Sequence, residues 1–463
     1  MWNALADTIQ NTSRGTTISQ SSSSEILVSS AATPTSATGI VEKIQLGSYS
    51  LADQAFAVGG MFLANVALAR VGSKEEYGIF ALCYSVYTFV AGVHNALLLE
   101  PYTVFGSGRY HRIFGSYAKL MKRSNTLLCL SSSGVFVVVW LLLHWIAPHL
   151  ATPALLGMAL TSGLLLTGAF IRRSFYIERS PNRAAQFSLA FFTVVALLLY
   201  AGIRGQWLSG FSTFVIAGAS WALAAFAFRT VVPGRDADGS FKQFETGYWS
   251  EHWKYARWVL ATAFVFQLMT QGYYWIIAGF LSVQDLAGFR AMHLLVMPVD
   301  QVFTAVILLI LPMLALRYAT GQHRALISLW GKFALLLFGI AVVFATGVHE
   351  LALPLLHVLY GGKFDDLAGL LGLLVLVPVV TGVGNSTNAA LKAIEQPHAV
   401  FWAYVASGGV TFVAGIPLVI HFGVRGAVYG MILSAIAYTA TLTALWMPFK
   451  FRMVSESRPN EIG

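Results

Sequence analysis

One stretch of the chain places four side chains of useful chemistry on a single helical face. They follow one another at spacings of three, four and three residues: Arg290, His293, Met297 and Asp300. Such spacings return to the same side of a helix. A guanidinium binds a phosphate through two parallel hydrogen bonds. Pro298, beside this stripe, removes a backbone donor, so we expect a kink there. The pattern is compatible with a gated path for an anion.

Two roles remain open for the ionisable groups of this stripe. In the first, Arg290 pairs with a phosphate group of a ligand and Asp300 is a coupling group that takes up H⁺ or Na⁺. In the second, Asp300 neutralises Arg290 in a structural ion pair that fixes helix packing. His293 lies between them on the same face. Ionisable groups at membrane depth are costly and normally face a cavity or a partner, which fits both roles.

A second acid, Asp53, lies early in the apolar segment 48–68. Gln54 and Asn65 belong to one helical stripe that follows it. One interpretation is a cavity wall with a protonatable carboxylate. The other is a carboxylate near the headgroups that caps or orients its helix.

Amide side chains occur on two further helical faces. The first carries Asn385, Asn388 and Lys392, and the second carries Gln267 and Gln271. Amides both donate and accept hydrogen bonds, as sugar hydroxyls require. The alternative is hydrogen bonding between neighbouring helices.

A pair of basic residues, Arg172 and Arg173, follows the fourth apolar segment. They are either topology determinants or the first contact of an incoming phosphate group.

The elements that must position these residues are twelve apolar segments of about 17–26 residues, each long enough to cross a hydrocarbon core of ~30 Å as a helix. They are 48–68, 77–99, 126–147, 152–171, 184–202, 210–228, 258–280, 287–312, 332–348, 366–389, 400–422 and 426–447. The two ends of the chain and every second gap hold 22 of the 29 Lys and Arg residues. The positive-inside rule assigns these regions, including both termini, to the cytoplasm.

Composition excludes several classes of protein. The chain is 57% hydrophobic and only 11% charged, which is too apolar for a soluble protein. The net charge of +9 follows the alternation of the gaps and forms no continuous patch, so we expect no nucleic-acid partner. Cys83 and Cys129 lie within apolar segments and are expected to be free buried thiols. No metal-ligand spacing is present, and we expect no metal.

The segments divide six and six around the turn-rich linker 229–257. We therefore predict an all-α polytopic membrane protein of about twelve transmembrane helices in two six-helix lobes with pseudo-twofold symmetry, 48–228 and 258–447. Stretches 71–81 and 281–291 are weakly similar and support this repeat. Residues 1–47, rich in Ser and Thr, are predicted to be a disordered cytoplasmic tail, in which Ile40 to Leu46 begin an interfacial helix that enters the first segment. Residues 448–463 are predicted to be a second cytoplasmic tail. Two such lobes indicate a transporter with a site between them.

Several motifs, in order and spacing, resemble those of a known family. They are Asp53-Gln54, Asn65 to Arg70, Glu75 to Leu82, Arg172 to Tyr176, Leu359 to Phe364 and Gly426-Ala427. Over about residues 45–450 the chain resembles Wzx-type polysaccharide flippases of the multidrug/oligosaccharidyl-lipid/polysaccharide exporter (MOP) superfamily. Two features depart from the family: the first lobe has no basic residue at mid-membrane, and the Ser/Thr-rich tail is unusual.

The resemblance implies translocation of an isoprenoid-pyrophosphate-linked saccharide across the bacterial inner membrane. We expect no cofactor beyond a coupling H⁺ or Na⁺, an expectation that rests only on the depth of Asp53 and Asp300. The resemblance also implies a polysaccharide polymerase and glycosyltransferases as partners. The main alternative is a multidrug-type small-molecule antiporter of the same superfamily. A membrane-embedded saccharide polymerase or ligase is a third hypothesis, but the external gaps hold too little charged chemistry to support an enzyme.

Overall fold

The structure is a computed structural model that describes residues 37–108, 110, 113–228 and 248–456. It divides into two compact units, Met1–Gln45 and Leu46–Gly463, and the description below concerns the second. All regular elements of the described residues are helices. The predicted all-helical fold is confirmed. The predictions for residues 1–36, for 229–247 of the linker and for 457–463 lie outside the described residues.

The helices of the first lobe, with their bounds, are α2 (Ala37–Val71), α3 (Lys74–His94), the π-helical turn η1 (Asn95–Leu99), α4 (Glu100–Ser107), α5 (Phe114–Ile146), α6 (Pro153–Ile177), α7 (Pro181–Arg204) and α8 (Gly210–Ala227). Those of the second lobe are α10 (Tyr248–Phe280), α11 (Val283–Ala319), α12 (His323–Glu350), α13 (Ala352–Tyr360), α14 (Ala368–Leu374), α15 (Leu376–Ala393), α16 (Pro397–Val413) and α17 (Gly415–Glu456).

Every one of the twelve predicted segments lies in a helix. Ten helical spans in the described residues are long and apolar enough to cross a membrane. The other two segments correspond to α10 and to α16 with the start of α17. Gly423 interrupts α17 and separates the eleventh predicted segment from the twelfth. Its φ of +61° lies in the left-handed region, which glycine adopts without steric cost. The chain is therefore a multi-pass membrane protein.

Helix starts follow local sequence signals. Ser73 begins α3 by accepting a hydrogen bond from the backbone N–H of Glu76. Ser282 begins α11 in the same way, with Asp285 completing a capping box. These two N-caps occupy nearly equivalent places in the two stretches that the sequence identified as similar. The α11 helix continues through Pro298 and Pro312.

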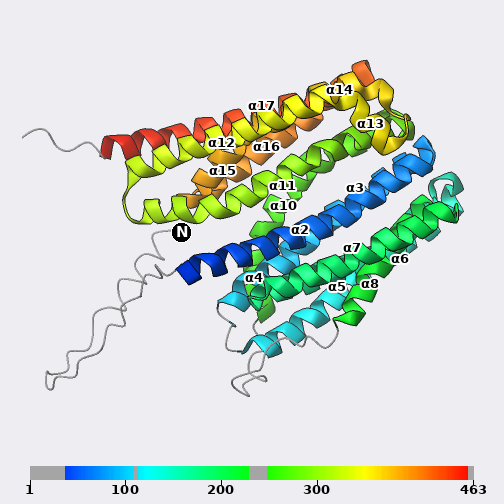
Figure 1. Ribbon diagram of the computed structural model, residues 1–463, viewed down its shortest axis with the longest axis horizontal. Helices are drawn as coiled ribbons and strands as arrows, with labels where there is room; N and C mark the ends of the chain where they lie inside the picture. Colours follow the sequence, from blue (N-terminus) through cyan, green and yellow to red (C-terminus); the bar gives the residue numbers. More distant parts are fainter. Residues whose placement is uncertain (1–36, 109, 111–112, 229–247, 457–463) are drawn as a thin grey trace, which may run out of the picture. The chain divides into compact units, whose positions relative to one another are not determined.

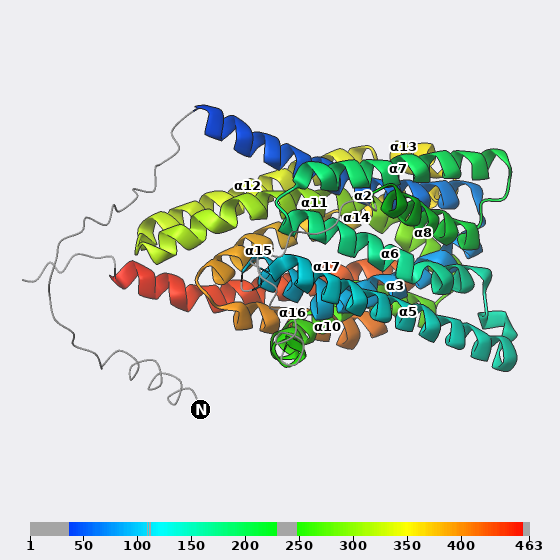
Figure 2. The ribbon, with the colours of Figure 1, turned by 90° about the horizontal axis from the view of Figure 1, so that it is seen from below.

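Packing groups the helices into the two lobes. In the first, α6 packs against α5 and α8, and Figure 2 shows α5 and α6 running alongside one another. In the second, α17 packs against α15 and α16, and α12 packs against α15 (Figure 1). The lobes meet where α3 packs against both α10 and α11.

Candidate functional site

The guanidinium of Arg290 joins the two lobes. It lies on α11 of the second lobe, where its Nε donates to Oδ1 of Asn65 on α2 at 3.1 Å. Its Nη1 donates to the hydroxyl of Tyr274 on α10 at 2.9 Å. The arginine is only 4% exposed. The sequence placed Asn65 and Arg290 in separate stripes, and the structure brings them into contact.

Tyrosine rings enclose the same guanidinium. Its carbon lies 4.9 Å from the ring centre of Tyr84, on α3, and 5.6 Å from that of Tyr274. The Tyr274 hydroxyl also lies 2.7 Å from Nδ1 of His293. Cation–π contacts of this kind are worth most when the cation is desolvated. Arg290 is thus stabilised by neutral groups, and in the described part of the chain it has no carboxylate partner.

Asp300, farther along the stripe, is not the partner of Arg290. The ten residues between them span about 15 Å of helix. The side chain of Asp300 is exposed, and it has no hydrogen bond or ion pair to any described residue. Arg290 and Asp300 share one face of α11, and this face meets the first lobe at Arg290. At Asp300 the same face is exposed, because the first lobe does not cover it. The structure therefore favours an unpaired acid over the structural ion pair.

A second set of contacts bridges the lobes at the end of the bundle where α2 ends and α3 and α11 begin. We call this the bridged end. Lys363, after α13, donates to the backbone carbonyls of Gly72 and Ala69 at 2.5 and 3.4 Å. Partial burial there lowers the pKa of Lys363 below its ordinary value. In return, Arg70 donates to the carbonyl of Val358. Each lobe thus caps a helix end of the other.

Aromatic and backbone contacts reinforce the bridged end. The ammonium of Lys74 lies 5.2 Å from the ring centre of Phe364. Gly78 on α3 approaches the carbonyl of Val283 at the start of α11, and a Cβ at this glycine would collide with that oxygen. The lobes therefore meet backbone to backbone here, which only glycine permits.

Asp53 has a different environment, entirely inside the first lobe. It is fully buried and accepts two hydrogen bonds from Arg172 on α6, at 3.0 and 2.6 Å. The hydroxyls of Tyr176 and Ser188 also donate to it, at 2.7 and 2.5 Å. Gln54 accepts from Arg172 at 3.4 Å. The carboxylate is fully partnered, which favours its interpretation as a group that orients helices.

The remaining predicted cations lie near the other end of the bundle. Arg173 donates to Oδ1 of Asn95 at 3.1 Å. Lys392 on α15 is exposed, with Glu100 of the first lobe within electrostatic range. Tyr255 donates to Glu100 at 3.4 Å. Residues from both lobes therefore face one another here without an ion pair among the described residues.

The predicted amides divide into partnered and open groups. Asn388 donates to the hydroxyls of Tyr438 and Tyr404 at 2.7 and 3.3 Å, and Tyr438 donates to Asn385 at 3.4 Å. Gln267 reaches across the lobes to the carbonyl of Thr88 at 3.2 Å. These contacts match the helix–helix alternative.

Two amide groups remain open. Gln271 is partly exposed, and its side chain has no hydrogen bond to a described residue. The Oδ1 atom of Asn388 is buried without a donor. These two groups have spare capacity for a polar ligand.

Sequence reasoning placed Tyr274 on the polar face of Gln267 and Gln271, but it missed Tyr84 beside Arg290 and the cations of the bridged end. One signal was present: Tyr77 and Tyr84 are seven residues apart and share a helical face. Nothing in the sequence connects Lys363 with Gly72, which are 291 residues apart. Cys83 and Cys129 are free and buried, as predicted. The described residues contain no group of three side chains able to hold a metal ion.

Comparison with solved structures identifies the architecture. The chain superposes on an inward-facing multidrug resistance MATE-family transporter of the MOP superfamily with a TM-score of 0.72, at 12% identity over 88% of this chain and 96% of the other. A MOP-superfamily transporter from Pyrococcus furiosus, described as having a binding pocket of reverse polarity, gives 0.61 at 12% identity over 90% and 96%. This chain has the two-lobe fold of MATE transporters.

The superposition also differs between conformations. An outward-facing multidrug resistance MATE-family transporter gives a TM-score of 0.58, at 13% identity over 89% of this chain and 96% of the other. No protein-family model matches the sequence, and no curated protein matches it. The three solved structures named above are transporters, and none of the three is described as a flippase.

Proposed function

We propose that this protein is a membrane transporter that works by alternating access of its two lobes. One observation carries the proposal: a single face of α11 is covered by the first lobe at Arg290 and uncovered at Asp300. A path closed at one end and open at the other is the arrangement that alternating access requires. The TM-score is higher with the inward-facing transporter than with the outward-facing one, which supports an arrangement with one closed end and one open end.

Small amphipathic organic molecules are the substrate class with most support. Multidrug resistance transporters are among the similar structures. The open face of α11 offers an unpaired carboxylate at Asp300 beside Met297, whose flexible side chain adapts to varied apolar shapes. A carboxylate and aromatic rings attract organic cations. We therefore infer export of such molecules, coupled to H⁺ or Na⁺ through Asp300 rather than through the fully partnered Asp53.

An efflux assay tests this substrate class. The full chain, expressed in a drug-sensitive host, should lower the accumulation of cationic dyes in a gradient-dependent manner, and Asp300→Asn should abolish that dependence. Asp366→Asn, the same change at an exposed loop acid, is the matched control. Unchanged accumulation of every dye would contradict the multidrug proposal, and full gradient-dependent transport by Asp300→Asn would contradict the coupling role.

A lipid-linked oligosaccharide is the second candidate substrate, favoured by a specific observation. Among the described residues, the partners of the buried Arg290 are neutral groups, which a pyrophosphate would replace when the lobes separate. Loss of the protein should then cause lipid-linked saccharide to accumulate on the cytoplasmic face, with no rescue by Arg290→Met. Accumulation on the outer face would indicate a polymerase, and no accumulation would contradict this candidate.

The orientation of the chain in its membrane is part of the same proposal. We infer a bacterial inner membrane, with the bridged end outside and both termini in the cytoplasm, from the distribution of Lys and Arg. Single cysteines at Glu350 and Gln322, which are exposed at opposite ends of α12, test it in a background without Cys83 and Cys129. An impermeant thiol reagent should label only Glu350→Cys in intact cells. The reverse result would invert the topology.

A further inference from the structure

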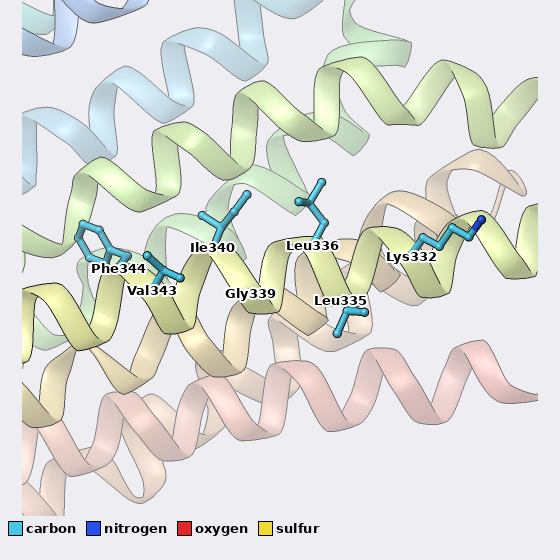
Figure 3. Close-up of a pocket in the computed structure, with 7 residues that line it drawn as sticks. All are labelled: Lys332, Leu335, Leu336, Gly339, Ile340, Val343 and Phe344. Atoms are coloured by element: carbon cyan, nitrogen blue, oxygen red, sulfur yellow. The ribbon is translucent and has the colours of Figure 1, made fainter.

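The α12 helix carries an apolar groove that the transport path does not use. Its volume is about 780 Å³. Seven residues line it, all on α12, and Figure 3 shows Lys332 at one end and Phe344 at the other. The full lining is Lys332, Leu335, Leu336, Gly339, Ile340, Val343 and Phe344. The helix packs chiefly against α15 and α11 of the second lobe. The groove is therefore separate from the face that meets the first lobe.

The missing side chain of Gly339 creates the hollow. Leu335, Gly339 and Val343 are spaced by four residues and form one row on the helix. Leu335 is 71% exposed and Val343 is 74% exposed, so they form a wall on either side of the glycine. A Cβ placed on Gly339 would meet nothing within 4 Å. The hollow is open and apolar, as an acyl chain requires.

The groove has a single charged residue, and that residue lies where headgroups are expected. One turn or less from Lys332, the ring of Trp330 lies 5.5 Å from that of Trp446, and the ammonium of Lys450 lies 5.3 Å from Trp330. Tryptophan and lysine mark the membrane interface. Lys332 thus lies at the level of the helix where aromatic and basic residues gather.

The length of the groove matches one leaflet. Twelve residues separate Lys332 from Phe344, which corresponds to about 18 Å of helix. Half of a hydrocarbon core is ~15 Å. We propose that the groove binds an anionic phospholipid of the surrounding bilayer, with its phosphate at Lys332 and one acyl chain along Gly339. Charge selects this occupant over a neutral lipid, because Lys332 otherwise has no counter-charge in the groove.

Native mass spectrometry of the full chain, purified with equimolar phosphatidylglycerol and phosphatidylcholine, tests the site. The protein should retain phosphatidylglycerol preferentially and with saturation. Lys332→Gln should reduce that preference about fivefold, which corresponds to the ~1 kcal/mol of one lysine near an anionic lipid. Lys332→Arg should keep it. Gly339→Phe should reduce retention of both lipids, because the ring fills the hollow without displacing a neighbour.

Two matched controls make the test decisive. Gly347→Phe places the same ring on the same helix where a Cβ also meets nothing within 4 Å, but outside the groove. Lys122→Gln removes an exposed basic residue from α5. Both should retain lipid as the unaltered protein does. Equal loss in the controls, equal retention of the two lipids, or a change from dimer to monomer on Gly339→Phe would overturn the proposal, the last by identifying a second copy as the occupant.

Discussion

Two arginines, one partly exposed and one buried, show how differently one fold can hold a cation. Arg172 pairs with the carboxylate of Asp53, and all its partners belong to the first lobe. Arg290 has an amide and aromatic rings as partners, and two of them belong to the opposite lobe. A carboxylate that shares a lobe with its partner stays paired whatever the lobes do. Neutral partners across an interface are lost when the lobes separate, so only Arg290 can respond to movement.

The largest effect is expected where the ion pair lies within one lobe. Arg172→Ala leaves the fully buried Asp53 without its counter-charge and should lower the free energy of unfolding by about 3–5 kcal/mol. Equilibrium unfolding in detergent micelles measures this change. Arg173→Ala, which loses one bond to Asn95, is the matched control and should cost about 1 kcal/mol. Similar decreases in the free energy of unfolding for the two variants would contradict a structural role of the Asp53–Arg172 pair.

Giving Arg290 a carboxylate partner should make it resemble Arg172, which stays paired with an acid. Asn65→Asp keeps the shape of the side chain and makes its bond to Arg290 charge-assisted, worth about 1.5–3 kcal/mol. The bridged end should then stay closed, so transport should fall although the protein is more stable. Distances between spin labels on α3 and α11 would report a narrower distribution. Faster transport would show that contact with Asn65 does not limit opening.

Removing one hydroxyl should have a smaller effect. Tyr274→Phe deletes the bonds to Arg290 and His293 and should destabilise the protein by about 1–2 kcal/mol. Both bonds join α10 to α11 within the second lobe, so the distances between the lobes should remain the same. Thermal unfolding and the same spin-label measurement separate these outcomes. A wider distance distribution would mean that Tyr274 also holds the lobes together.

The smallest effect is expected at Tyr84. Tyr84→Phe retains the ring that faces the guanidinium of Arg290, and the cation–π attraction survives loss of the hydroxyl. Stability should change by less than about 0.5 kcal/mol. Tyr84→Leu removes the aromatic face and should cost about 1–2 kcal/mol. Equal losses for the two variants in thermal unfolding would show that the ring face does not stabilise Arg290.

Much of the fold was predictable because the membrane limits the choices. Buried backbone groups in lipid must bond within a helix, so apolar length alone located all twelve segments. The stripe from Arg290 to Asp300 was predictable because helical spacing fixes which residues share a face. Its partners were not. Asn65 lies 225 residues from Arg290, and helical periodicity says nothing about contacts at that separation.

The sequence by itself determined the all-helical class, the two-lobe architecture, and the helical faces on which charged and amide side chains lie. Those features follow from the length of apolar stretches and from local geometry. Only the tertiary structure decided that Asp53 is neutralised by Arg172, that Arg290 lies among tyrosines of both lobes, and that Asp300 is left uncovered. Partner choice depends on how lobes pack, and packing is set by contacts between residues far apart in the chain.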